Sequence, residues 1–161
     1  MRLQGKVALL TGAAAAIKGE LMGFGGAAAH LFVREGAKVV LTDIRDDLGE
    51  RAKREGLANL KPVQATAGEA RLPAKVDLVL LVDVYHHIET RERYFQRLAA
   101  SLRPEARVAV IDFRLDSPEG PPKAARIAPE RVKAELARAG YALVEEHGFL
   151  PRQYFLVFRP R

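Results

Sequence analysis

Apolar runs of strand length alternate with segments of helical spacing along the whole chain. The strand-like runs are Lys6–Thr11, Lys38–Thr42, Leu60–Thr66, Val76–Val82, Arg107–Phe113, Tyr141–Glu146 and Gln153–Phe158. The helix-like segments are Gly23–Glu35, Asp46–Glu55, Glu92–Leu102 and the stretch from Pro129 to Gly140. Strands that alternate with helices in this way are typical of a parallel sheet with helices on both faces.

The last two strands break this alternation, because only a short connection with Pro151 separates them. A parallel crossover needs about a dozen residues or more, so this pair is predicted to be an antiparallel hairpin at the edge of the sheet. Apart from Asp77, Val76–Val82 is apolar and is predicted to be central, whereas Pro62 interrupts the weaker strand Leu60–Thr66. We therefore predict one Rossmann-like three-layer α/β/α domain over residues 1–161, with a seven-stranded, mostly parallel sheet.

Composition narrows the class of protein without identifying its activity. The 161 residues are 48% hydrophobic and 29% charged, with no cysteine and no apolar run long enough to span a membrane. The net charge is +6, but basic and acidic residues are interleaved, as in Arg45–Arg51, so nucleic acid is disfavoured as a partner. The lack of cysteine and of room for a signal peptide before Lys6 predicts a cytoplasmic protein that binds no membrane.

Four short segments follow the first four predicted strands and carry the candidate chemistry. They are Thr11–Ala14, Asp43–Ile44, Ala67–Ala70 and Asp83–His87. In open α/β sheets, ligands bind beyond the carboxyl ends of the strands, where the strand order reverses. We therefore expect the four segments to share one crevice that binds a small molecule.

Glycines near the first of these segments favour a bound phosphate. Gly12 and Ala13 follow the first strand, and Gly23 and Gly25 open the next helix. A backbone without Cβ can turn sharply and approach a ligand closely, and a helix N-terminus attracts negative charge. Small residues also let a helix pack tightly on a sheet, so the glycines alone leave both interpretations open.

Asp43 ends the second strand, twenty residues beyond Gly23, and Ile44 follows it. A carboxylate at this position can accept both hydrogen bonds of a ribose diol. The alternative role is the N-cap of the following helix, which Asp46 could serve instead. Together with the glycines, Asp43 predicts a crevice for a small-molecule cofactor that contains adenosine.

The first third of the chain, residues 1 to about 55, resembles the short-chain dehydrogenase/reductase family. The likeness is carried by Gly5–Gly12, Gly23–Gly25 and Gly36–Asp43. It implies NAD binding, with the pyrophosphate at these glycines and the adenosine ribose at Asp43. The family's phosphate loop is lengthened here by Ala13–Met22. No tyrosine of the chain is followed four positions later by lysine, so the family's proton-donating Tyr-x-x-x-Lys is missing and dehydrogenase activity is not expected.

The remainder, about Asn59 to Arg161, resembles the class I S-adenosylmethionine-dependent methyltransferases. The likeness is carried by Gly68–Ala70, Leu72–Pro73, Val76–Ile88, Leu102–Pro104, Arg107–Phe113, Ala139–Tyr141 and Phe149–Phe158. It implies that Glu69, with Ala70, lies near the adenine amino group and that Asp83 lies beside the methyl group. The family's first motif, an acid and a Gly-x-Gly loop, is replaced here by Thr11–Ala14.

The same resemblance makes Tyr85 and His86 the candidates for catalysis, since the residues after the fourth strand line the substrate side of the family's pocket. The adjacent His86 and His87 point in different directions and have no acidic or histidine partner at ligand spacing, so no metal site is expected. Asp112, after the fifth strand, is interpreted as structural.

The two likenesses meet near Gly56–Lys61. This predicts a junction between a dehydrogenase-like βαβ unit over residues 1–55 and a methyltransferase-like remainder over residues 56–161, and its abruptness favours an engineered chimera. The leading hypothesis is a domain that binds S-adenosylmethionine and has weak or no methyltransferase turnover. The alternatives are an NAD-binding module without dehydrogenase activity and a scaffold that binds no ligand.

Overall fold

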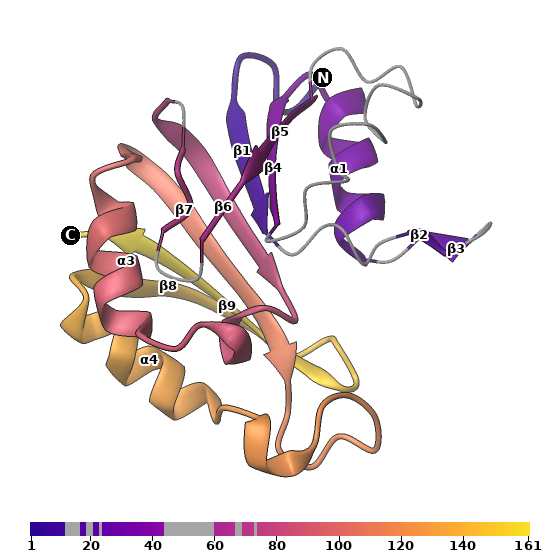
Figure 1. Ribbon diagram of the computed structural model, residues 1–161, viewed down its shortest axis with the longest axis vertical. Coiled ribbons are helices and arrows are strands. Elements are labelled where there is room, and N and C mark those ends of the chain that lie inside the picture. The colour runs from indigo at the N-terminus through magenta and orange to yellow at the C-terminus, as the bar shows by residue number, and fades with distance from the viewer. Residues whose placement is uncertain (12–16, 19–20, 23, 44–59, 67–68, 73) are drawn as a thin grey trace.

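The structure is a computed structural model that describes residues 1–11, 17–18, 21–22, 24–43, 60–66, 69–72 and 74–161 (Figure 1). Its strands are β1 (Val7–Thr11), β2 (Ile17–Lys18), β3 (Leu21–Met22), β4 (Lys38–Asp43), β5 (Leu60–Gln64), β6 (Val76–Val82), β7 (Leu102–Phe113), β8 (Tyr141–His147) and β9 (Gln153–Pro160). The described helices are α1 (Phe24–Arg34), α3 (Arg91–Ala99) and α4 (Pro129–Arg138), with short 3₁₀ turns η2 (Tyr85–His87) and η3 (Lys123–Ala125).

Seven of the strands form one sheet in the order β5-β4-β1-β6-β7-β9-β8. The first five strands in that order are parallel, and β9 is antiparallel to both of its neighbours. The predicted seven-stranded, mostly parallel sheet with an antiparallel C-terminal hairpin is confirmed. Strands β2 and β3 form a separate two-stranded ribbon that the sequence pattern did not predict.

Helices α3 and α4 cover one face of the sheet and α1 covers part of the other (Figure 1). Successive side chains of a strand point to opposite faces, so each strand contributes to two cores. The core under α3 and α4 includes Val79, Leu81, Phe95, Val110, Leu136 and Leu156. The core under α1 includes Ala8, Leu10, Ala29, Leu80, Ala109 and Ile111. The apolar stretches that predict central strands are therefore buried on both faces.

The end of α3 differs from the sequence-based prediction. The helix ends at Ala99 rather than Leu102, because the buried Leu102 begins β7 and pairs with Val76 of β6. The N–H of Ser101 donates to the carbonyl of Leu98 and closes the last turn. The predicted helix over Asp46–Glu55 lies outside the described residues.

The two edge strands are irregular. In β5, at one edge, Pro62 is paired in register with Leu41 of β4. In β8, at the other edge, the register shifts between Leu143 and Glu145. Each edge therefore departs from a regular ladder.

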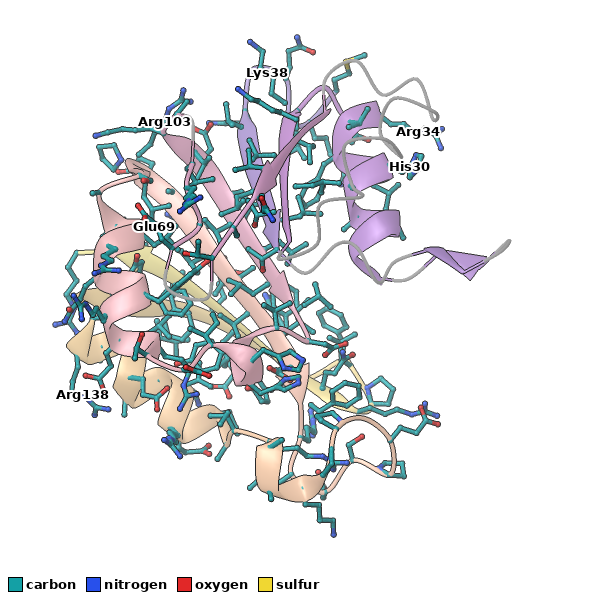
Figure 2. All side chains as sticks on the ribbon, in the orientation of Figure 1. His30, Arg34, Lys38, Glu69, Arg103 and Arg138 are labelled. Carbon is teal, nitrogen blue, oxygen red and sulfur yellow. The ribbon has the colours of Figure 1, made fainter. Side chains whose placement is uncertain are left out.

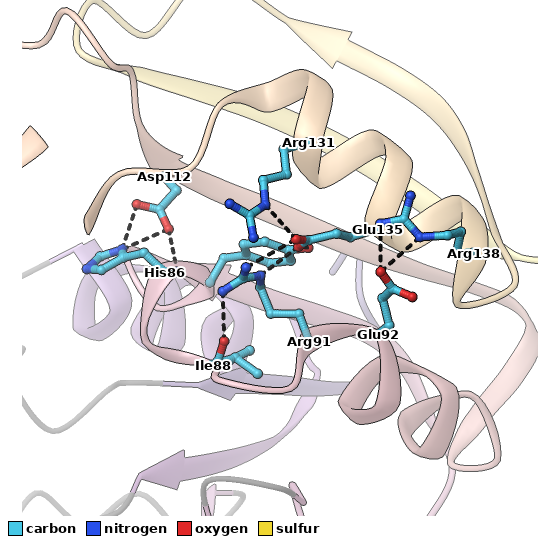
Figure 3. Close-up of polar contacts among 9 residues, drawn as sticks. His86, Ile88, Arg91, Glu92, Asp112, Arg131, Glu135 and Arg138 are labelled. Atoms are coloured by element: carbon cyan, nitrogen blue, oxygen red, sulfur yellow. Dashed lines mark hydrogen bonds and ion pairs between the residues drawn. The ribbon is translucent and has the colours of Figure 1, made fainter. Parts of the chain in front are cut away.

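A buried carboxylate joins the segment after β6 to α4 (Figure 3). Glu135 of α4 is only 7% exposed at its side chain, and its Oε2 accepts hydrogen bonds from the Tyr85 hydroxyl at 2.7 Å and from Arg91 Nε at 2.6 Å. Its Oε1 accepts from Arg91 Nη2 at 3.1 Å and from Arg131 Nε at 2.8 Å. Two guanidinium groups and one hydroxyl thus satisfy a charge that would be costly to bury alone.

No helix within the described part of the chain has the length and apolar character needed to cross a bilayer. Within the same residues, no group of three or more His, Cys, Asp or Glu side chains is arranged so that it could hold a metal ion.

The Glu135 network predicts a pH dependence of stability. Burial alone would raise the pKa of Glu135, but the hydrogen bonds from Arg91, Tyr85 and Arg131 outweigh it and lower that pKa to about 2 from the usual 4.5. Because the folded-state pKa is depressed, the network stabilises the fold above the unfolded pKa and is lost as the pH falls toward about 2. We expect Glu135→Gln to remove a pH-dependent contribution of up to about 3 kcal/mol to the free energy of unfolding.

Urea unfolding at stepped pH between roughly 5 and 2 measures this contribution. Glu130→Gln, an exposed change in the same helix, serves as the control and should leave the pH dependence as in the wild type. The same slope of stability against pH in the wild type and in Glu135→Gln would contradict the prediction.

Candidate functional site

The carboxyl ends of the parallel strands meet at one edge of the sheet. Thr11, the last residue of β1, pairs with Thr42 of β4 on one side and with Leu81 of β6 on the other. Asp43 pairs with Gln64, the last residue of β5. The chain runs from β1 outward to β5 and then returns to β6 on the other side of β1, so the strand order reverses beside β1. This is the position at which open α/β sheets bind their ligands.

The strand ends place two of the predicted cofactor residues at this edge. Asp43 is the last residue of β4, and Asp83 directly follows β6. Gly25 lies in the first turn of α1. The remaining predicted residues of the phosphate and ribose sites, Gly12, Ala13, Gly23 and Ile44, lie outside the described residues.

Glu69 and Ala70 follow β5 but turn toward α3 (Figure 2). They line a small cavity of about 90 Å³ together with Leu98 and Ser101. The carbonyl of Ser101 accepts a hydrogen bond from the N–H of Val76 at the start of β6, which is the end of that strand opposite to Asp83. The structure therefore does not bring Glu69 and Ala70 together with Asp83.

Tyr85, one of the two catalytic candidates, lies in the core. Its side chain is fully buried, stacks on Phe95, and donates its hydroxyl hydrogen to Glu135. Burial and the neighbouring Glu135 carboxylate raise the pKa of Tyr85. In this position the hydroxyl is part of the network that holds η2, and it does not face the strand-end crevice.

His86, the other candidate, forms a close pair with Asp112 of β7 (Figure 3). Its Nδ1 lies 2.9 Å from each carboxylate oxygen of Asp112, and its backbone N–H donates to Oδ2 at 3.1 Å. The N–H of Phe113 donates to Oδ1 at 2.8 Å, which fixes the carboxylate. The hydrogen bond from His86 to Asp112 raises the pKa of the imidazole.

The sequence did not predict this pair, because 26 residues separate its members. One feature of the sequence could have indicated the pair. Each residue stands at or just beyond the carboxyl end of an apolar run, and the two runs form the neighbouring strands β6 and β7. The structure thus gives Asp112, which the sequence suggested was structural, a direct contact with a catalytic candidate.

Asp83 lies in a left-handed conformation, with φ of 55°, at the turn between β6 and η2. Its Oδ1 accepts a hydrogen bond from Gln153 Nε2 of β9 at 2.7 Å. Burial, partly offset by this bond, raises the pKa of Asp83, and the nearby Asp112 carboxylate adds to the effect. The carboxylates of Asp112 and Asp83 therefore both lie near the His86 imidazole.

A buried hydroxyl at the end of β1 offers a further polar contact. Among the described residues, Thr11 Oγ1 and the Tyr154 hydroxyl are the buried side-chain polar atoms without a hydrogen-bond partner. Buried polar groups in proteins are nearly always satisfied, so such an atom calls for an explanation. Thr11 stands at the point of strand reversal, where a polar ligand group would satisfy it.

An open apolar groove of about 690 Å³ lies on the α1 face of the sheet. Its lining includes Ala28, Leu31, Phe32, Leu80, Ile111 and Phe149, and Arg107 is the one charged residue among the described residues that line it. A cofactor with a ribose and charged groups needs polar partners. The groove is therefore a separate feature from the crevice at the strand ends.

The geometry of Asp83 predicts which substitutions the turn tolerates. A left-handed φ costs most non-glycine residues about 1–2 kcal/mol, and asparagine and aspartate adopt it most readily. We expect Asp83→Asn to keep the stability within about 0.5 kcal/mol, because the amide oxygen still accepts from Gln153. Asp83→Ala loses the bond and keeps the strain, so it should cost about 2 kcal/mol in the free energy of unfolding. Equal urea midpoints for the two variants would contradict this.

Curated proteins of the dehydrogenase type match a short part of this chain. A borneol dehydrogenase of Lavandula x intermedia is 57% identical over 47 residues, which are 29% of this chain and 15% of that protein. Tropinone reductase-like 1 of Erythroxylum coca is 51% identical over 49 residues, or 30% of this chain and 15% of that protein. The matches thus span less than a fifth of those relatives and leave most of this chain uncovered.

Solved structures of methyltransferases match the whole fold. An S-adenosylmethionine-dependent methyltransferase from Aquifex aeolicus has a TM-score of 0.85 at 20% identity and covers 100% of this chain and 85% of its own. An S-adenosylmethionine-dependent methyltransferase from Mesorhizobium loti has a TM-score of 0.77 at 14% identity, over 99% and 93% of the two chains. The 1,6-didemethyltoxoflavin-N1-methyltransferase of Burkholderia thailandensis, solved with S-adenosylhomocysteine, has a TM-score of 0.69 at 20% identity, over 98% and 72%.

A family model matches the sequence across both segments, the one that resembles dehydrogenases and the one that resembles methyltransferases. Residues 21–110 match the methyltransferase domain family, which is more than half of the chain. The match begins within the segment that resembles dehydrogenases and continues through β6, η2 and most of β7. The chain belongs to the methyltransferase domain family.

Proposed function

We propose that this domain binds S-adenosylmethionine in the crevice at the carboxyl ends of β4, β1 and β6 and transfers its methyl group to a small molecule. The observation that carries the proposal is the strand reversal beside β1, flanked by Asp43 and Asp83, in a chain of the methyltransferase domain family. The S-adenosylhomocysteine bound to the structurally similar Burkholderia enzyme supports the same cofactor class.

The chain's own residues fit such a cofactor at several points. Asp43 would accept hydrogen bonds from the ribose diol. The Thr11 hydroxyl, which has no partner among the described residues, would contact a polar group of the amino-acid part. The N-terminal turn of α1, with Gly25, allows close approach of the backbone. The cofactor supplies an electrophilic methyl group on a positively charged sulfur.

Thr11 stands where class I methyltransferases carry an acid, so this chain offers a neutral hydroxyl to the ammonium group of the cofactor. A charged hydrogen-bond partner contributes about 1.5–3 kcal/mol and a neutral one about 0.5–1.5 kcal/mol. We therefore propose that S-adenosylmethionine binds this domain more weakly than in enzymes with the acid, and that turnover is correspondingly slow.

NAD binding is a second candidate, favoured by the matches to plant dehydrogenases. The same Asp43 carboxylate would hold the adenosine ribose of either cofactor. Hydride transfer is not part of this candidate, because no tyrosine in the chain is followed four positions later by lysine. Calorimetric titration of the purified protein with each cofactor distinguishes the two candidates.

Asp43→Ala should weaken binding of S-adenosylmethionine by roughly ten- to a hundredfold, because charge-assisted hydrogen bonds to the diol are lost. Asp43→Asn should be milder, since the amide oxygen still accepts one bond. Titration calorimetry measures the affinity, and thermal melting of the same samples measures the stability. If Asp43 only caps a helix, its loss would lower stability by about 1 kcal/mol and leave affinity unchanged.

Glu105→Ala is the matched control for this experiment. Glu105 is an exposed acid near the start of β7, at the end of the strands opposite to the crevice. Its removal changes the net charge as Asp43→Ala does but should leave the affinity unaltered. Unchanged affinity in Asp43→Ala would reject the ribose contact and with it the proposed crevice.

A further inference from the structure

We propose that His86 is the general base of methyl transfer, that Asp112 is its positioning residue, and that the methyl acceptor is an uncharged molecule with an O–H group. This inference rests on the proposed methyltransferase function and names its acceptor class. It is drawn from the pairing of the His86 imidazole, just beyond the end of β6, with the fixed carboxylate of Asp112 in β7. Asp83 lies three residues before His86.

The hydrogen bonds of Asp112 determine which ring nitrogen of His86 can accept a proton. The carboxylate lies 2.9 Å from Nδ1 and already accepts from the backbone N–H groups of His86 and Phe113. An ionised carboxylate can only accept, so Nδ1 must carry the hydrogen. The neutral imidazole therefore has its lone pair on Nε2, and no hydrogen bond to Nε2 is formed by the described residues.

The charged groups around His86 favour a protonated ring after the reaction and disfavour an anionic acceptor before it. Asp112 faces the imidazole from β7, Asp83 from the turn after β6, and His87 from within η2, with its ring centroid 4.1 Å away. Both carboxylates raise the pKa of His86. They would repel a carboxylate or phosphate acceptor at the same place, so an uncharged acceptor fits better. Among uncharged acceptors, one with an O–H group needs a base to take its proton, which is the role that His86 can fill.

The position of His86 suits a proton acceptor near the reacting atoms. It lies three residues after Asp83, just beyond the carboxyl end of β6, which is one of the strand ends that border the proposed cofactor crevice. Its side chain is only 5% exposed, so a group that reaches Nε2 is largely shielded from water. A general base must come within about 2.6–3.2 Å of the proton that it removes.

The proposed step conserves atoms and charge. The acceptor oxygen attacks the methyl carbon of the sulfonium, an O–C bond forms, and the C–S bond breaks with its electron pair returning to sulfur. The O–H proton passes to Nε2 of His86 and then leaves to solvent. The products are a methyl ether, neutral S-adenosylhomocysteine and one proton.

The first test needs no cofactor. Nitrogen-15 NMR of the imidazoles should show His86 protonated at Nδ1 when neutral, with a pKa above the usual 6.5. In Asp112→Asn the His86 pKa should fall by about one unit or more, because the negative charge is removed. His147 lies in β8 with its ring against Phe155, on the opposite face of the sheet from Asp112, so its ring signals should be the same in Asp112→Asn as in the wild type.

The second test uses phenol and 4-nitrophenol as probe acceptors with methyl-labelled S-adenosylmethionine. Transfer to phenol should rise with pH through the His86 pKa, since the base works in its neutral form. His86→Gln should slow transfer to phenol by about a hundredfold or more. With 4-nitrophenol at a pH where that probe is already ionised, the effect of His86→Gln should shrink toward none, because the repulsion of the anion by Asp83 and Asp112 slows the wild type and the variant alike. The control His147→Gln should leave both rates unchanged.

The outcomes separate this inference from the proposed function. A His86 ring protonated at Nε2, or a His86 pKa that Asp112→Asn leaves in place, would overturn the pairing whether or not the cofactor binds. Equal loss of transfer to both probes in His86→Gln would show that the residue positions the acceptor and would overturn its role as base. Failure of the wild type to bind S-adenosylmethionine would instead reject the proposed function.

Discussion

The buried carboxylate of Glu135 holds in place the part of the molecule where chemistry is expected. An unpaired charge at this depth would be strongly destabilising, so the fold is compatible only with arrangements in which Arg91, Arg131 and Tyr85 reach it. Those donors come from the start of α3, from α4 and from η2. One acceptor therefore fixes three segments relative to one another, and His86 occupies the residue after the anchored Tyr85.

In the proposed function, one half of the sheet binds the cofactor and the other half carries the groups for proton transfer. The strands β1 and β4 end in Thr11 and Asp43, the proposed partners of the cofactor, whereas the groups proposed for proton transfer lie at or just after the ends of β6 and β7. The halves join where β1 pairs with β6, so the proposed cofactor crevice and His86, in the turn after β6, lie at neighbouring strand ends. Because many nucleotide-binding families share this central strand order, a first βαβ unit that resembles dehydrogenases is compatible with a methyltransferase remainder.

The elements that follow from local pattern were predicted from the sequence, and those that depend on distant contacts were not. The apolar run of β6 and the glycine after α4 signal their elements directly. The early end of α3 depends on the pairing of Leu102 with Val76, which no helical periodicity contains. Nothing in the sequence near Tyr85 shows that its hydroxyl reaches a carboxylate 50 residues away.

In the candidate site, too, only the features that depend on local sequence pattern could be predicted. Strand ends could be predicted because parallel strands present them together, and Asp43 and Asp83 do stand at or just after the ends of β4 and β6. Which of two adjacent side chains faces the core is decided by the 3₁₀ turn η2, so Tyr85 and His86 could not be distinguished beforehand. Glu69 likewise lies toward α3, in a cavity with Leu98, where a bridge to Thr66 holds it, and no local pattern in the sequence contains these contacts.

The irregular edge strands bear on how the protein behaves at high concentration. An edge strand with a free row of N–H and C=O groups can recruit a strand from another molecule and start aggregation. Pro62 removes one N–H from the middle of β5, and the bulge in β8 precedes two adjacent acids, Glu145 and Glu146. Each edge thus interrupts the ladder that a second sheet would need. The protein is thereby protected against open-ended growth of its sheet at both ends.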